Sequence, residues 1–169
     1  MEQKKYLTNE EKEREAENKF REWLDRHDVP YWYIQQDLET FSPALRRYMS
    51  RRPDFMILIP NLGFILTDVE FKALLEPYGK FPVDKDETEK YINLQKYFNI
   101  QVWYVFSHRK YHYNTWSWIP AQKVIELGEI YTSKQDNREF YGVRAEDTIQ
   151  LSGNDGLSTL LSKASFLLK

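Results

Sequence analysis

The chain contains no cysteine among its 169 residues, which excludes disulfide bonds, thiolate metal ligands and a cysteine nucleophile. It has 6 glycines and 7 prolines, too few for a fibrous or low-complexity protein. The longest uninterrupted apolar run, residues 55–59, is far shorter than the roughly 20 residues of a membrane-spanning helix. The charged N-terminal segment lacks the apolar core of a signal peptide, so we expect a cytoplasmic protein.

The chain also has no large excess of positive or negative charge. It contains 24 Lys and Arg residues and 26 Asp and Glu residues, for a net charge of -2. No overall field attracts nucleic acid, and any such binding requires a local basic patch. Glycine-rich phosphate loops and the GxSxG and HExxH motifs are missing. The length and the 41% hydrophobic content predict one folded domain over residues 1–169.

Helical spacing of Ala16, Phe20, Trp23 and Leu24 predicts a helix over residues 8–27, with a capping residue at Thr8 or Asn9. Further along, the patterns predict a strand at 31–35, a short helix from 42, a hairpin over 53–72, a loop at 74–86, a helix at 87–98, strands at 101–106 and 115–119, a short helix at 120–127, late strands within 140–151 and a helix at 156–168. This order predicts an α/β (α+β) fold with a mixed sheet flanked by helices.

The predicted hairpin carries the chain's most informative polar residues. Alternate side chains of a strand share a face, so Asp68, Glu70 and Lys72 point the same way. A surface ion pair of Lys72 with one of these acids explains that pattern by itself. The partner strand begins at Asp54, however, and a turn at residues 61–62 brings Asp54 close to residues 69–71. Two adjacent carboxylates repel each other unless a proton or a cation lies between them, and oxygen ligands select Mg²⁺ or Mn²⁺.

Pro53-Asp54 followed by Glu70-Phe71-Lys72 resembles the motif of the PD-(D/E)xK nuclease superfamily, which includes restriction endonucleases and Holliday-junction resolvases. The resemblance spans about residues 10–106. It implies a restriction endonuclease-like α-β-β-β-α-β core at about 10–119, with a C-terminal elaboration at about 120–169. It also implies a Mg²⁺- or Mn²⁺-dependent endonuclease that hydrolyses phosphodiester bonds in DNA. Asp54, Glu70 and the Phe71 carbonyl would hold the metal, and Lys72 would orient or activate the attacking water.

The superfamily commonly adds an acid from the first helix, which implies Glu17 as a further catalytic residue and metal ligand, with Glu13 as the alternative. Eight acids lie between Glu2 and Asp25, so a solvent-facing role for either is the competing interpretation. Some members carry a glutamine on the next helix, which implies a contact of Gln95 with Lys72 or the substrate, although Gln95 is equally an ordinary surface residue. Asp68 departs from the motif, either as a ligand or as a competitor for Lys72.

Two groups of basic residues are candidate DNA contacts, since arginine pairs bidentately with phosphate. The first lies just before Asp54 and the second is partly in an aromatic loop: Arg46, Arg47, Arg51 and Arg52, then Lys80, Arg109 and Lys110. Solvated charge runs are the competing interpretation. Cutting both strands of DNA would call for a homodimer. A catalytically inactive module of the same fold, binding nucleic acid or a protein, is the alternative function, and an unrelated interaction protein with surface ion pairs is the third.

Overall fold

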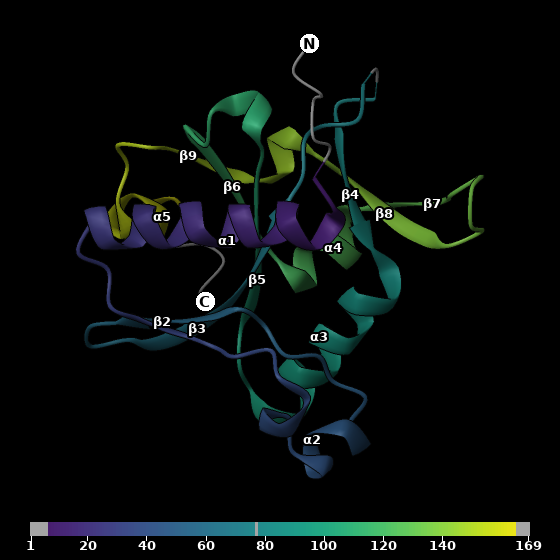
Figure 1. The fold of residues 1–169 in the computed structure, drawn as a ribbon, viewed down its shortest axis with the longest axis horizontal. Coiled ribbons are helices and arrows are strands. Elements are labelled where there is room, and N and C mark those ends of the chain that lie inside the picture. Colours follow the sequence, from purple (N-terminus) through teal and green to yellow (C-terminus); the bar gives the residue numbers. More distant parts are fainter. Residues whose placement is uncertain (1–6, 77, 165–169) are drawn as a thin grey trace.

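The computed structural model describes residues 7–76 and 78–164, and Figure 1 shows their arrangement. The helices and strands, in chain order, are α1 (Asn9–Arg26), β1 (Tyr31–Tyr33), α2 (Pro43–Arg47), β2 (Phe55–Ile59), β3 (Gly63–Phe71), β4 (Lys80–Asp84), α3 (Lys85–Phe98), β5 (Val102–Ser107), β6 (Thr115–Pro120), α4 (Ala121–Leu127), β7 (Glu129–Thr132), β8 (Glu139–Arg144), β9 (Ile149–Ser152) and α5 (Leu157–Lys163). No helix in these two described ranges is both long and apolar enough to cross a membrane.

Six strands form the main sheet in the order β1-β2-β3-β5-β6-β9. The β3–β5 pair is parallel and the other pairs are antiparallel, so the sheet is mixed. A smaller sheet has the order β4-β8-β7. The predicted fold class is therefore confirmed as a mixed sheet with flanking helices. The expected order α-β-β-β-α-β runs from α1 to β5, with short helices and strand β4 added along the way.

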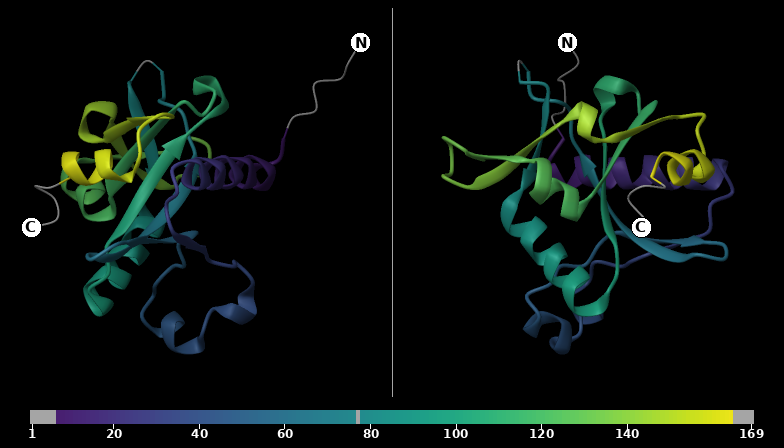
Figure 2. Two further views of the ribbon diagram at one scale, coloured as in Figure 1. Left: turned by 90° about the vertical axis from the view of Figure 1, so that its left-hand side faces the viewer. Right: turned by 180° about the vertical axis from the view of Figure 1, so that it is seen from behind.

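Strand β5 shows how the main sheet builds two cores. Its side chains alternate between faces: Trp103 and Val105 join a cluster with α1 residues, whereas Tyr104 and Phe106 join a cluster with α3 and α4. Figure 2 shows α1 lying across one side of the sheet, with α3 and α4 on the other. All six residues of β5 are buried, because this strand is covered on both faces.

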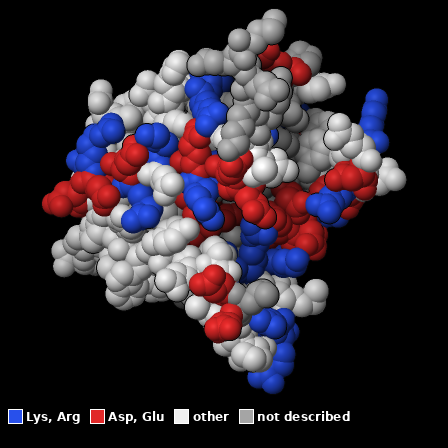
Figure 3. All heavy atoms as spheres, in the orientation of Figure 1, with Lys and Arg blue, Asp and Glu red and all other residues white. Residues whose placement is uncertain are grey.

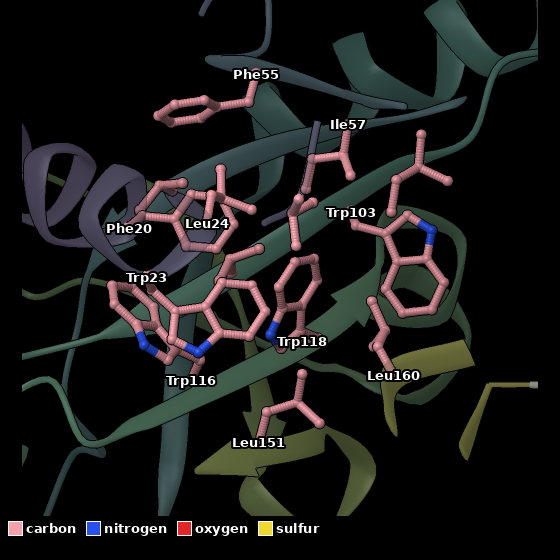
Figure 4. Packing of buried hydrophobic residues seen from close by; sticks show 14 of the residues in the cluster. Phe20, Trp23, Leu24, Phe55, Ile57, Trp103, Trp116, Trp118, Leu151 and Leu160 are labelled. Carbon is pink, nitrogen blue, oxygen red and sulfur yellow. The ribbon is translucent and has the colours of Figure 1, made fainter. Parts of the chain in front are cut away.

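Aromatic rings dominate the core on the α1 side. The ring of Phe20 lies 5.3 Å from that of Phe55, 5.2 Å from that of Trp116 and 5.5 Å from that of Trp118, measured between centroids. Figure 4 shows these rings packed between α1 and the sheet. The helix is capped as predicted, since the Thr8 side chain accepts a hydrogen bond from the Glu11 backbone. Aromatic contacts of this kind anchor α1 on the sheet.

The β2–β3 hairpin sets the register of the polar residues. Its turn spans residues 60–62, with Asn61 at φ 64° and Gly63 at φ 115°, backbone conformations that asparagine and glycine tolerate best. The register pairs Phe55 with Thr67, so Asp54 lies opposite Asp68 just beyond the pair. The predicted hairpin therefore forms and brings the acids of the two strands together.

Three boundaries differ from the sequence predictions. The predicted loop at 74–86 is wrong over Lys80–Asp84, which forms β4. This strand pairs with β8, so that Lys80 lies beside Arg144, 64 positions later in the sequence. Pro82 obscures this strand, but β4 is an edge strand, where the missing amide is tolerated. Strand β1 ends at Tyr33 rather than at 35, and β7 was not predicted. The last part of the predicted helix 156–168 lies outside the described residues.

Candidate metal and phosphodiesterase site

Strand β3 carries two buried acids on the face turned toward α3. Asp68 and Glu70 share that face with Leu66, which belongs to the α3-side core. Asp68 is 3% exposed and Glu70 8% exposed, so the polar end of this strand is buried. Such burial is costly for charged groups and needs compensation.

Asp54 completes a trio of buried acids. Its Oδ2 accepts a hydrogen bond from the Val69 backbone amide at 2.8 Å, and its carboxyl group is hydrogen-bonded to that of Asp68. Burial, and then the charge of Glu17, raise the pKa of Asp54 to about 7. Burial and the charge of Asp54 also raise the pKa of Asp68. These acids therefore do not readily ionise together without an added positive charge.

Lys72 lies beside this trio. Its Nζ is 3.3 Å from Glu70 Oε2 and donates a hydrogen bond to the Pro82 carbonyl at 2.8 Å. Burial lowers the pKa of Lys72, but the charge and hydrogen bond of Glu70, together with the charges of Glu13 and Glu87, outweigh burial, and the pKa is raised overall. Lys72 is therefore a fixed positive charge at neutral pH, held by one acid and one carbonyl.

The first helix contributes both candidate acids, one of them directly to β3. Glu13 Oε2 accepts a hydrogen bond from the Phe71 backbone amide at 3.1 Å, and burial followed by the charge of Glu70 raises the pKa of Glu13 to about 7. Glu17 instead accepts a hydrogen bond from the Tyr33 hydroxyl at 2.5 Å. The structure thus brings Glu13, the alternative from the sequence, closest to the motif strand.

Two further charged residues join the cluster from outside the motif. Arg51 Nη1 forms an ion pair with Glu87 Oε1, and Arg51 Nε donates to the Tyr91 hydroxyl at 3.2 Å. Burial lowers the pKa of Arg51, but the charges of Asp68, Tyr91 and Glu87 together outweigh this effect, and the pKa is raised overall. Arg51 is therefore a counter-charge to the buried acids, and its side chain remains partly exposed. Glu87 was not identified from the sequence, where its only signal is a position in the first turn of a helix.

Gln95 lies away from the motif residues. Its Oε1 accepts a hydrogen bond from the Val102 backbone amide at 2.8 Å, at the start of β5. The register places Val102 beside Leu66, whereas the Lys72 amide binds the Ser107 carbonyl at the other end of that strand. The contact between Gln95 and Lys72 implied by the resemblance is therefore not formed, because the two side chains lie at opposite ends of the β3–β5 pair.

Most of the predicted DNA-contacting residues have partners within the chain. Arg52 donates to the Asp37 carbonyl at 2.9 Å, and Lys80 lies 2.8 Å from Glu129. Arg109 pairs with Glu15 and Lys110 with Glu76. Arg46 and Arg47 lie exposed on α2. Figure 3 shows acidic side chains gathered across the middle of the face that carries α1, interleaved with basic ones, rather than one continuous basic surface.

Two surface hollows lie beside the acid cluster. One of about 340 Å³ is lined by Glu13, Lys72, Pro82 and His108 among others. The other, of about 550 Å³, is lined by residues around Arg51 and Glu87. Lys72 and Glu87, at the edge of the cluster, therefore each border a surface hollow.

The donor set fits a hard divalent cation. Asp68, Glu70 and Glu87 each offer one carboxylate oxygen, and these oxygens lie within 4.8 Å of one another. Asp68 Oδ2 is buried and has no hydrogen-bond partner among the residues that the structure describes. Carboxylate oxygens with surplus negative charge are the ligands that Mg²⁺ and Mn²⁺ prefer.

Comparison with known proteins shows a similarity of fold but none of sequence. No family model matches the chain, and no curated protein matches it in sequence. Among solved structures, the chain is similar to Hjc, a Holliday junction resolvase from the archaeal hyperthermophile Archaeoglobus fulgidus. The TM-score is 0.48 and the identity 13%, over 79% of this chain and 97% of that one. The similarity concerns the fold alone.

Proposed function

We propose that the chain is a divalent-metal-dependent nuclease of the PD-(D/E)xK type that hydrolyses phosphodiester bonds in DNA. The observation that carries this proposal is the meeting of buried Asp54 with the Glu70–Lys72 ion pair, whose closest atoms are 3.3 Å apart, at one end of the β2–β3 hairpin. An ordinary surface ion pair does not require two buried acids with mutual repulsion beside it.

Asp54, Glu70 and the Phe71 carbonyl would hold Mg²⁺ or Mn²⁺, with Glu13 and Glu17 facing the same end of the hairpin. When bound, the cation supplies positive charge that stabilises the oxyanion developing on the phosphate and acidifies a coordinated water. The chain's own contribution is to hold the acids in place before the ion arrives. The Val69 amide fixes Asp54, and the Phe71 amide fixes Glu13.

Lys72 and Glu13 supply the remaining chemistry. Lys72 Nζ, fixed by Glu70 and the Pro82 carbonyl, holds a positive charge that orients an attacking water and offsets charge on the phosphate. Hydrolysis adds the water oxygen to phosphorus, breaks one phosphorus–oxygen ester bond and releases a proton. Glu13, with a pKa of about 7, is suited to accept that proton near neutral pH.

DNA is the proposed partner, and its backbone would be held by arginines near the hairpin. Arg46 and Arg47 on α2 are exposed, and Arg52 lies between α2 and Asp54. Arg51 is already committed to Glu87. Cleavage of both strands would bring together two copies of the chain, each with one site. Sedimentation of the chain with and without DNA measures this association.

The proposal is tested by incubating the purified chain with supercoiled, linear and four-way branched DNA in Mg²⁺, in Mn²⁺ and in EDTA. We expect cleavage of at least one form in the presence of metal and none in EDTA. Lys72→Met should lower the rate by about 100-fold or more, as loss of a positioned charge does. Lys90→Met, which removes an exposed lysine of α3 paired with Asp86, is the matched control and should cleave normally.

The outcomes separate the proposal from its alternatives. DNA binding without cleavage in any metal would favour the inactive nuclease-fold module. Cleavage that survives Lys72→Met unchanged would contradict the assigned site, because the observed activity would then come from elsewhere.

A further inference from the structure

Asp68 is an acid of the cluster that the motif does not require. It is 3% exposed, and its Oδ2 has no hydrogen-bond partner in the described part of the chain. The neighbouring strand residue is Tyr104, whose hydroxyl pairs with Thr88 rather than with Asp68. A buried carboxylate oxygen without a donor is costly, and native structures rarely retain one without a ligand or a specific role.

Glu87 brings a second unassigned carboxylate to the same place. It comes from the first turn of α3, on the side of β3 opposite to α1, and one of its oxygens lies within 4.8 Å of the oxygens offered by Asp68 and Glu70. Ligand oxygens bind a divalent cation at about 2.0 to 2.6 Å, so two ligands of one ion lie at most about 5 Å apart. The three carboxylates meet that condition without rearrangement.

The ion pair with Arg51 leaves carboxylate oxygens of this group available to a cation. The Arg51 guanidinium pairs with Glu87 Oε1, which leaves the second oxygen of that carboxylate. The pairing also fixes the Glu87 side chain over β3, because Arg51 is itself held by Tyr91. Arg51 therefore acts as a positioning residue for Glu87.

The formal charges leave room for more than one cation. Two bases, Arg51 and Lys72, form ion pairs within the cluster. Six carboxylates lie in and around it: Glu13, Glu17, Asp54, Asp68, Glu70 and Glu87. When all are ionised, the surplus is four negative charges. One divalent ion at Asp54 and Glu70 would neutralise only half of it.

We propose that Asp68, Glu70 and Glu87 form a second divalent-cation site, for Mg²⁺ or Mn²⁺, on the α3 side of β3. It rests on the proposed function in sharing Glu70 with the motif site, but Asp68 and Glu87 belong to this site alone. Of its three acids, Glu87 borders the hollow that Arg51 also lines, whereas Glu13 and Lys72 line a different hollow.

The test is a Mn²⁺ titration of the full chain at pH 8. The electron paramagnetic resonance signal of free Mn²⁺ measures how much of the ion remains unbound. Wild type should bind two Mn²⁺ per chain. Glu87→Gln and, separately, Asp68→Asn should each bind one, while circular dichroism reports their folding. Glu89→Gln, an exposed acid two residues further along α3, should still bind two.

Each result decides the proposal. Two Mn²⁺ bound by wild type and by both variants would overturn the second site and leave the proposed nuclease intact. A single Mn²⁺ bound by wild type, and lost when Asp54 is substituted, would also overturn the second site and leave the proposed nuclease intact. No Mn²⁺ bound by wild type would overturn both. The Asp68→Asn result stands on its own if Glu87→Gln fails to fold.

Discussion

The two faces of β3 carry side chains of opposite character. Val69 packs with α1 in a core of aromatic rings, whereas Asp68 and Glu70, its neighbours in sequence, turn the other way and meet further acids. Alternation along one strand therefore places a stabilising surface back to back with a repulsive one. The comparison indicates that packing on the α1 face stabilises the fold, whereas the clustered acids on the other face oppose it unless their charge is compensated.

The largest effect should come from the acid face and appear in activity alone. Glu70→Gln keeps the side-chain size but removes the charge paired with Lys72. We expect DNA cleavage to fall by about 1,000-fold or more, equivalent to about 4 kcal/mol of transition-state stabilisation. Single-turnover cleavage assays measure it. Glu22→Gln, on the exposed surface of α1 and paired with Lys19, should cleave like wild type. Comparable losses in the two variants would show that the faces do not differ in function.

The next effect should come from the α1 face and appear in stability. Trp118 is fully buried against Phe20 and Trp23, so Trp118→Ala should lower the free energy of unfolding by about 3 to 5 kcal/mol. Urea unfolding measures it. Trp32→Ala is the matched control, because that ring is 63% exposed on edge strand β1, and the change should stay within about 0.5 kcal/mol. A loss of less than about 1 kcal/mol for Trp118→Ala would contradict the packing described here.

A smaller effect of opposite sign should come from Asp68. Asp68→Asn removes a buried charge that repels Asp54 and Glu70, at the cost of its attraction to Arg51. Without divalent metal at pH 8, we expect unfolding to require about 1 to 2 kcal/mol more free energy than in wild type. Asp86→Asn should instead lose a few tenths of a kcal/mol, because that carboxylate favours the first turn of α3. Calorimetric unfolding in EDTA separates the two signs.

The smallest effect is a pH dependence of stability in EDTA. The pKa of Glu13 is raised from its ordinary value of 4.5 to about 7, chiefly by burial. Between about pH 4.5 and pH 7 the folded protein therefore holds a proton that the unfolded chain has lost, and stability falls as the pH rises through that window. Glu13→Gln should flatten the fall by on the order of 1 to 2 kcal/mol, since this partly exposed group is screened by solvent. A pH profile unchanged by Glu13→Gln would contradict the assigned environment of this carboxyl.

Local pattern was enough to predict the elements that build the hairpin. The alternation of β2 and β3, the turn at Asn61 and the capped first helix are all local signals, and the structure confirms them. Strand β4 was missed because its pairing with β8 joins residues far apart in sequence, and because Pro82 lowers its strand signal. Long-range pairing of an edge strand leaves little trace in its own residues.

In the candidate site too, contacts between residues close in sequence were predicted, and contacts between distant residues were not. The pairing of Glu70 with Lys72 follows from two positions on one strand, and the proximity of Asp54 follows from one hairpin. Whether Glu13 or Glu17 reaches β3 could not be decided, because the two are one helical turn apart on the same face of α1. The position of α1 along the sheet decides which acid reaches β3. Glu13 accepts a hydrogen bond from the Phe71 amide, and Glu17 accepts one from the Tyr33 hydroxyl.

Glu87 and Arg51 show what the sequence does not carry. They meet across 36 positions, through the packing of α3 against the segment before β2. Arg51 and Arg52 are adjacent, yet extended backbone turns them apart, so that one faces the acids and the other the loop near Asp37. A run of charged residues in a sequence does not indicate in which direction each side chain points.

The most direct measurement is a calorimetric titration of Mg²⁺ into the chain at pH 7, repeated in two buffers of different ionisation enthalpy, which counts the protons released on binding. Because the pKa values of Asp54 and Glu13 are both raised to about 7, both acids are partly protonated beforehand. We predict Mg²⁺ binding with proton release, both abolished in the Asp54→Asn/Glu70→Gln variant. Equal Mg²⁺ binding by the variant and wild type, or no binding by wild type, would contradict the account.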